Sequence, residues 1–137
     1  MASGVSPASR ARYRASVLKL IALACSLSAL FALLDPDHVA TQFGMLLVGV
    51  NGYSQFYAIY VGGRLATAGL ALLAARQGEL PILGDVTAMF LLAQPFGHLV
   101  ASFAIGLPQG IVLELCGLQL LGGLTLLALR PRPLKRQ

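Results

Sequence analysis

Apolar residues along this chain fall into four long runs, which short polar or Gly/Pro-rich breaks separate. The runs cover residues 15–34, 56–76, 82–106 and 109–129. A helix needs about 20 apolar residues to cross a bilayer, and each run meets that length. The pattern therefore predicts an all-α polytopic membrane protein, a four-transmembrane-helix bundle that forms one domain over residues 15–129.

Residues that end helices occupy the breaks. Asp-Pro-Asp at 35–37 stops the first helix, because proline cannot continue it and the two carboxylates favour water. Gly and Pro also mark the later breaks, at 77–81 and 106–110. Residues 38–55 have helical spacing of apolar residues but are too short and too rich in glycine to span a bilayer. Between helices 1 and 2 we expect either a short interfacial or re-entrant helix over the outer mouth of the bundle, or an ordered loop.

Composition agrees with a membrane protein. The chain is 57% hydrophobic and 11% charged, whereas soluble domains average roughly 25% charged residues. The formal net charge of +5 would suggest a nucleic-acid partner if the protein were soluble. Here the basic residues flank the apolar runs, so we interpret them as topology signals in contact with anionic lipid headgroups. We predict membrane lipids as partners, and no nucleic acid.

Basic residues are distributed asymmetrically along the chain. Nine of the ten Lys and Arg residues belong to one predicted side of the membrane. These nine are Arg10, Arg12, Arg14, Lys19, Arg76, Arg130, Arg132, Lys135 and Arg136. The loops of the opposite side, 35–55 and 106–109, contain neither Lys nor Arg. The positive-inside rule therefore predicts that the basic N-terminal segment (1–14) and the basic tail (130–137) are both cytoplasmic.

The tenth basic residue, Arg64, lies inside the second apolar run, where a charge is costly and marks a paired or functional position. At about 1.5 Å per helical residue, Arg64 and His98 would lie roughly 12 Å below the outer face, and Glu114 roughly 7–8 Å below it. We expect an ion pair between Arg64 and Glu114. His98 would complete a polar pocket beneath residues 38–55.

Other polar side chains share these helix faces. One stripe follows the third helix at i, i+4, i+8 spacing, and another follows the first half of the second helix. The expected pocket-lining residues are Tyr57, Tyr60, Gln94, Ser102 and Asn51. Gln119 lies off the Glu114 face, so we predict that it makes an interhelical hydrogen bond and does not bind a ligand.

No pattern in the sequence predicts a metal site or a cofactor. His38, His98 and Glu114 lack the close spacing that metal ligands usually have. The chain has no glycine-rich phosphate loop. Cys25 and Cys116 lie inside apolar runs without a CxxC partner, which is typical of buried, inert thiols.

Several short motifs resemble a known family. They are the Asp-Pro at 35–36, FYAIYVGG, RLATAGLALL, GHL, GLPQG and LELCG, which together cover roughly residues 30–125. In this order they resemble the small four-helix membrane proteins grouped as DUF4345, which are related in style to the DoxX-like proteins. That family often has an arginine where this chain has His98, and Asp-Gly where it has Ile105-Gly106. The resemblance implies a four-helix membrane fold far more than a function.

Three functional hypotheses fit the polar residues. In the first, the protein is a cofactor-independent enzyme acting on a lipophilic small molecule or secondary metabolite. Glu114 and His98 would be its general acid and base, and Arg64 would hold an oxyanion or tune Glu114. Isomerisation, cyclisation or epoxide opening needs only such proton transfer in a dry pocket.

In the second hypothesis the protein is a structural or accessory membrane subunit, where the polar residues fix the register of the helices. In the third it is a small transporter that works as a dimer, with Glu114 as the proton-coupled site. A fixed arginine beside Glu114 would hold that carboxyl ionised and oppose proton coupling. A homo-oligomer or a membrane-complex partner is compatible with all three.

Overall fold

The computed structural model describes residues 6–78 and 80–131, and every regular element in those residues is helical. Four of the helices are long and apolar enough to cross a membrane, which supports an integral multi-pass membrane protein and confirms the predicted all-α class. The elements are α1 (Pro7–Leu34), α2 (Pro36–Gln42), α3 (Gly49–Phe56), η1 (Tyr57–Gly63), α4 (Arg64–Arg76), α5 (Pro81–Ile105) and α6 (Ile111–Ala128).

Two helices begin earlier than the sequence suggested. Helix α1 starts at Pro7, where Ser6 caps it by accepting a hydrogen bond from the backbone N–H of Ser9 at 3.2 Å. The predicted basic N-terminal segment is therefore largely the first turns of α1. The second crossing starts at Gly49, because α3, η1 and α4 form one continuous helix. Residues 1–5 and 132–137, with most of the predicted tail, lie outside the described residues.

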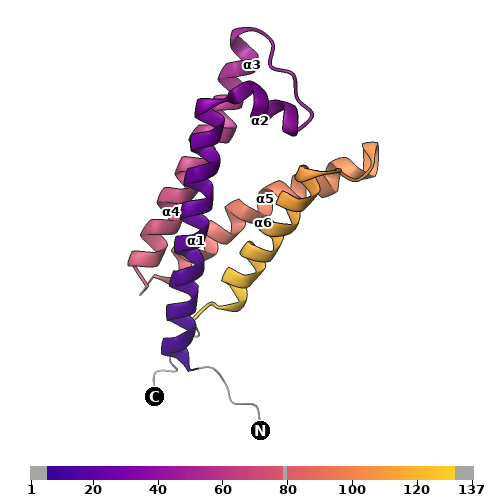
Figure 1. Cartoon of the computed structure of the whole chain (residues 1–137). Coiled ribbons are helices and arrows are strands. Elements are labelled where there is room, and N and C mark those ends of the chain that lie inside the picture. Colours follow the sequence, from indigo (N-terminus) through magenta and orange to yellow (C-terminus); the bar gives the residue numbers. More distant parts are fainter. Residues whose placement is uncertain (1–5, 79, 132–137) are drawn as a thin grey trace.

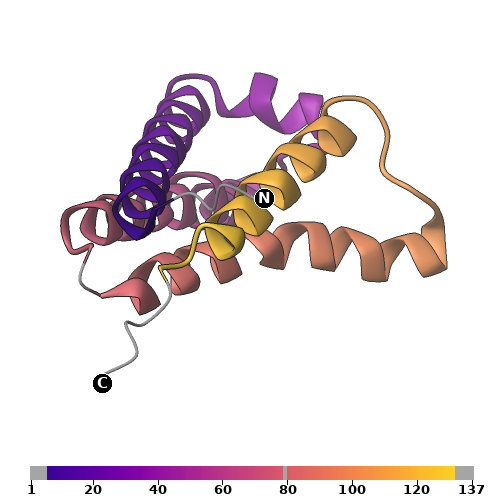
Figure 2. The same cartoon turned by 90° about the horizontal axis from the view of Figure 1, so that it is seen from below.

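The helices form two pairs. Helix α1 packs along α4, and α5 packs along α6, while fewer contacts join α4 to α5 and α1 to α6. Figure 1 shows α5 and α6 slanting away from α1 and α4, so that the two pairs are close near the chain termini and apart near α2 and α3. Figure 2, the view from below, shows the same divergence of the two helix pairs. The end opposite the termini, where the two pairs lie furthest apart, is here called the open end.

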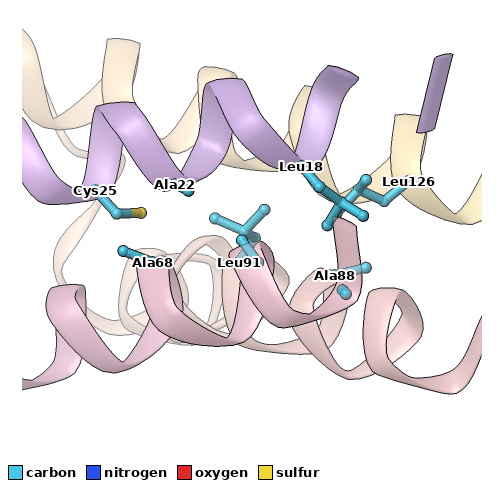
Figure 3. Close-up of a cluster of buried hydrophobic side chains, with 9 residues drawn as sticks. Leu18, Ala22, Cys25, Ala68, Ala88, Leu91 and Leu126 are labelled. Atoms are coloured by element: carbon cyan, nitrogen blue, oxygen red, sulfur yellow. The ribbon is translucent and has the colours of Figure 1, made fainter. Parts of the chain in front are cut away.

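Small side chains line the contact between α1 and α4. Figure 3 shows Ala22 and Cys25 of α1 facing Ala68 of α4, with Leu91 of α5 beside them. The buried cluster consists of Leu18, Ala22, Cys25, Ala68, Ala71, Ala74, Ala88, Leu91 and Leu126. Alanine-lined faces let helix backbones approach closely, and this close packing replaces the hydrophobic effect between helices in lipid.

The outer faces of the helices carry large apolar side chains. Phe31, Phe103 and Ile105 are 63%, 87% and 85% exposed. In water such a surface would be an aggregation liability. In a bilayer the same side chains contact lipid, so the burial pattern agrees with the membrane assignment.

Residues 36–56 form a compact cap at the open end. Asp35 caps α2 by accepting from the backbone N–H of His38 at 3.1 Å, and the Tyr53 hydroxyl donates to Asp37 at 2.7 Å. The loop between α2 and α3 turns at Gly44 (φ 71°) and Gly49 (φ 63°), in the left-handed region that glycine adopts without strain. The location of α2 at a membrane interface stays a prediction.

At the terminus end, a three-residue ion cluster, the arginine clasp, joins the two pairs. One Nη of Arg14 lies 2.5 Å from Asp85, Nε of Arg130 lies 2.8 Å from the other carboxylate oxygen, and Arg14 also donates to the Pro81 carbonyl at 3.0 Å. The Arg14 side chain is 5% exposed, whereas that of Arg130 is 60% exposed. The clasp therefore ties the start of α1 to the start of α5 and to the end of α6.

Replacement of Asp85 by Asn should destabilise the protein strongly, because it leaves the buried guanidinium of Arg14 without a counter-ion. Removing one partner of a buried pair costs about 3–5 kcal/mol. The measurement is thermal unfolding of the purified protein in a mild detergent.

Arg130→Gln is the matched control, since it removes the exposed arm of the clasp. Exposed ion pairs contribute about 0–1 kcal/mol, so its melting temperature should stay near that of the wild type. Equal losses in the two variants would contradict the proposed role of the Arg14–Asp85 contact.

Candidate functional site

Two irregular stretches of helix meet in the middle of the bundle. Arg64 is the first residue of α4, directly after the π-helical segment η1. On α5, Pro95 follows Gln94 inside the helix and cannot donate to the carbonyl of Leu91. Single turns of π-helix often occur at functional sites, because they re-aim one side chain out of the regular helix. The π-helical segment ends directly before Arg64, and Pro95 directly follows Gln94. Both irregularities therefore adjoin the hydrogen bond between Arg64 and Gln94.

The Arg64 guanidinium is held by two carboxamides. One Nη donates to Gln94 Oε1 at 3.0 Å. With the carbonyl oxygen of its amide turned to the guanidinium, Gln119 accepts from Arg64 Nη1 at 2.9 Å, and its nitrogen donates to Gln94. In this orientation the amide nitrogen of Gln119 does not face the N–H donors of Arg64. The cluster links α4, α5 and α6, and it confirms the prediction that Gln119 makes an interhelical hydrogen bond.

The positive charge of Arg64 has no negative partner within the described part of the chain. The ion pairs there, with N to O distances up to 4.0 Å, all involve Asp85; none joins Arg64 to Asp35, Asp37 or Glu114. Its Nε is also buried without a hydrogen-bond acceptor among the described residues. Neutral amide dipoles therefore solvate this charge without neutralising it, and one donor is left over.

Next to the guanidinium lies a cavity of about 150 Å³, here called the polar pocket. Helices η1, α4, α5 and α6 enclose it, and the loop after α2 covers it with Phe43 and Met45. Its lining residues are Phe43, Met45, Tyr60, Arg64, Gln94, His98, Val112, Leu115, Cys116 and Gln119. Phe43 stacks on Tyr60 with 5.1 Å between ring centroids, which fixes the cover to η1.

A second cavity, here called the apolar groove, lies between α5 and α6 and has a volume of about 510 Å³. Its walls are apolar apart from His98 and Ser102, and they include Phe96, Leu99 and Leu120. His98 and Cys116 line both cavities, so the groove adjoins the polar pocket. The site therefore has a charged part and an apolar part side by side.

The residues expected to line one pocket are distributed over several places. Tyr60 and Gln94 line the polar pocket with Arg64 and His98. Ser102 lines the apolar groove, and its hydroxyl donates to carbonyls of its own helix. Tyr57 packs beside the cap residues, in the cluster around Phe56. Asn51 lies exposed on α3 and lines neither cavity.

Glu114 does not join the polar pocket, and the expected ion pair with Arg64 is not formed. It is exposed near the start of α6. At 100° per residue, Glu114 lies about 140° around the helix from Gln119, which faces Arg64. Depth alone suggested that Glu114 and Arg64 could meet, but the rotation of α6 turns the carboxylate away.

The residues that sequence reasoning missed are neutral ones on the opposite face of α6. Val112, Leu115, Cys116 and Gln119 follow i, i+3, i+4, i+7 spacing and together form the α6 wall of the polar pocket. Attention to ionisable groups favoured Glu114 over Gln119. The available signal was the matching pair of glutamines, Gln94 and Gln119, since amides in lipid need partners on neighbouring helices.

Within residues 6–78 and 80–131, no three His, Cys, Asp or Glu side chains gather as a metal site would require. Comparisons with protein-family models, with curated proteins and with solved structures gave no match. The resemblance to DUF4345 and the DoxX-like proteins therefore stays a prediction.

Gln119→Leu should lower the thermal stability of the protein in detergent, because Arg64 loses an acceptor and Gln94 loses a donor. Leaving a buried polar group without its partner costs about 1–3 kcal/mol.

Glu114→Gln, five residues earlier on the same helix, serves as the control. Exposed substitutions without a partner change stability by about 0.5 kcal/mol or less, so its melting curve should overlay that of the wild type. If Glu114→Gln destabilises the protein as much as Gln119→Leu, the carboxylate has a role that the described contacts do not contain.

Proposed function

We propose that this small membrane protein binds a lipophilic small molecule by its polar end in the polar pocket. The observation that supports this proposal is the uncompensated guanidinium of Arg64 beside a cavity. An intramembrane charge without a counter-ion is expensive, and a chain that only needed to lock its helices could use the two glutamines alone. A ligand that accepts hydrogen bonds from Arg64 explains why the charge is present.

Acid–base conversion of the bound molecule is the catalytic form of this proposal. His98 is the side chain of the polar pocket that can act as general acid or base, and Tyr60 of η1 adds a hydroxyl donor to the same cavity. Arg64 would stabilise negative charge that develops on an oxygen of the substrate. Isomerisation, cyclisation or epoxide opening fits this set of groups, and Glu114 has no part in it.

A structural or accessory role is the second candidate, and a specific observation favours it. The hydrogen bonds among Arg64, Gln94 and Gln119 connect α4 of one helix pair to α5 and α6 of the other. In this alternative the polar pocket is a packing defect, and nothing needs to occupy it.

The orientation in the membrane belongs to the same proposal. The start of α1, the α4–α5 turn and the end of α6 lie together at the clasp, as an even number of crossings requires. The basic residues cluster at that end, so we assign it to the cytoplasm and the pocket cover to the opposite face. Assignment to DUF4345 is likewise part of the proposal.

Val112→Trp tests for an occupant, because an indole at that position fills the polar pocket from the α6 side. Wild-type and variant proteins would be purified in neutral detergent, extracted with organic solvent and compared by mass spectrometry. A compound specifically enriched with the wild type should fall by about tenfold in the variant, equivalent to ~1.4 kcal/mol of binding free energy.

Leu121→Trp is the matched control, since Leu121 is 65% exposed on the same helix and lines neither the polar pocket nor the apolar groove. It should retain the compound. If no compound is enriched with the wild type, or if both variants retain it, the binding proposal is wrong and the structural role gains support.

A further inference from the structure

We infer that the ligand is an anionic amphiphile, with a carboxylate or phosphate head bound at Arg64 and an aliphatic tail in the apolar groove. This inference rests on the proposed function and specifies its ligand class. It depends on three features: the charge balance of the polar pocket, the sizes of the two cavities and their shared walls.

The charge balance favours an anion over a neutral head group. A guanidinium has five N–H donors, and here two amide oxygens accept from it while Nε has no acceptor among the described residues. No carboxylate lines the cavity in the described part of the chain; its other polar groups are Tyr60, His98 and the glutamine amides. A carboxylate or phosphate would both neutralise the charge and accept the remaining hydrogen bonds, which a hydroxyl or carbonyl head cannot do.

The cavity sizes favour a small head and a separate tail. A water molecule takes up about 30 Å³, so the polar pocket of about 150 Å³ has room for a carboxylate or a phosphate but not for a complete lipophilic molecule. The adjoining groove, at about 510 Å³, is within the range of pockets that hold drug-sized ligands. A chain leaving the head would pass His98 and Cys116, which line both cavities.

The neighbouring cavity between α4 and α5 offers another path for the tail. It has a volume of about 360 Å³ and also touches Arg64, Gln94 and Gln119. Its mouth is lined by Ala58, Ile59 and Ala93. We assign the tail to the apolar groove because that cavity is larger and its walls contain no charged side chain.

The test uses the full chain in phosphatidylcholine nanodiscs and measures binding of three probes with the same hexadecyl chain. The probes are hexadecanoate, hexadecyl phosphate and methyl hexadecanoate, which has no charge. Wild-type protein should bind an anionic probe at least about tenfold more tightly than the ester, since hydrogen bonds to a charged group are worth a tenfold change or more. In Arg64→Gln this preference should vanish, and Arg64→Lys should keep part of it.

Competition identifies the source of the head group. Displacement of the probe by phosphatidylglycerol but not by inorganic phosphate supports an amphiphile, and displacement by inorganic phosphate alone overturns the tail assignment. Leu99→Trp should block binding by filling the apolar groove, whereas Ala93→Trp should not. The reverse result also overturns the tail assignment.

Three results would contradict this inference, and they differ in what else they reject. Equal binding of ester and anions, still blocked by Val112→Trp, leaves a lipophilic-ligand pocket but refutes an anionic head. Failure of all three probes to bind, with no compound enriched from cells, rejects the ligand class together with the proposed function. Retention of the anion preference in a folded Arg64→Gln protein shows that another group recognises the head.

Discussion

The constraint on which the candidate site depends is the positive charge of Arg64, which the neutral amides of Gln94 and Gln119 contact without balancing it. This contact joins α4 of one helix pair to α5 and α6 of the other. A carboxylate in place of either amide would have neutralised the charge of Arg64. Two amides do not, so the centre of the bundle keeps a net positive charge beside a cavity. That one constraint determines which molecules the cavity favours.

The chain contains a natural comparison for this arginine. Arg14 is also buried, and its Nε likewise has no acceptor among the described residues, but Asp85 balances its charge and the Pro81 carbonyl accepts from it. Arg130 shares the same carboxylate. The clasp therefore has the composition expected of a structural ion pair at the membrane edge. Arg64 differs in its charge balance: its partners are neutral amides, and a cavity of about 150 Å³ adjoins it. The contrast between the two sites is the physical reason for assigning stability to one and ligand binding to the other.

Sequence reasoning predicted the fold class well and the site only in part. Four apolar runs predict four helices because length and hydropathy are local properties of the chain. That Arg64 would contact neighbouring helices was also predictable, since it is the only Lys or Arg in the sequence that topology does not explain. Its partners were not, because they depend on the rotation of α6, which turns Gln119 inward and Glu114 outward. The early start of the second crossing, at Gly49, was missed because Gly49, Gly52 and Asn51 lower helix propensity, while packing of α3 against α2 and of η1 against α1 offsets that cost.

The central claim is that Arg64 carries an uncompensated charge kept for a ligand and does not lock the bundle. The most direct test is the melting temperature of Arg64→Met in neutral detergent, measured beside wild-type protein from which bound lipophiles have been washed out. Loss of an unpaired intramembrane charge should offset the lost hydrogen bonds, because Gln94 and Gln119 still pair with each other. The account predicts a melting temperature equal to or above that of the wild type. A clearly lower value would contradict it and identify Arg64 as a structural lock.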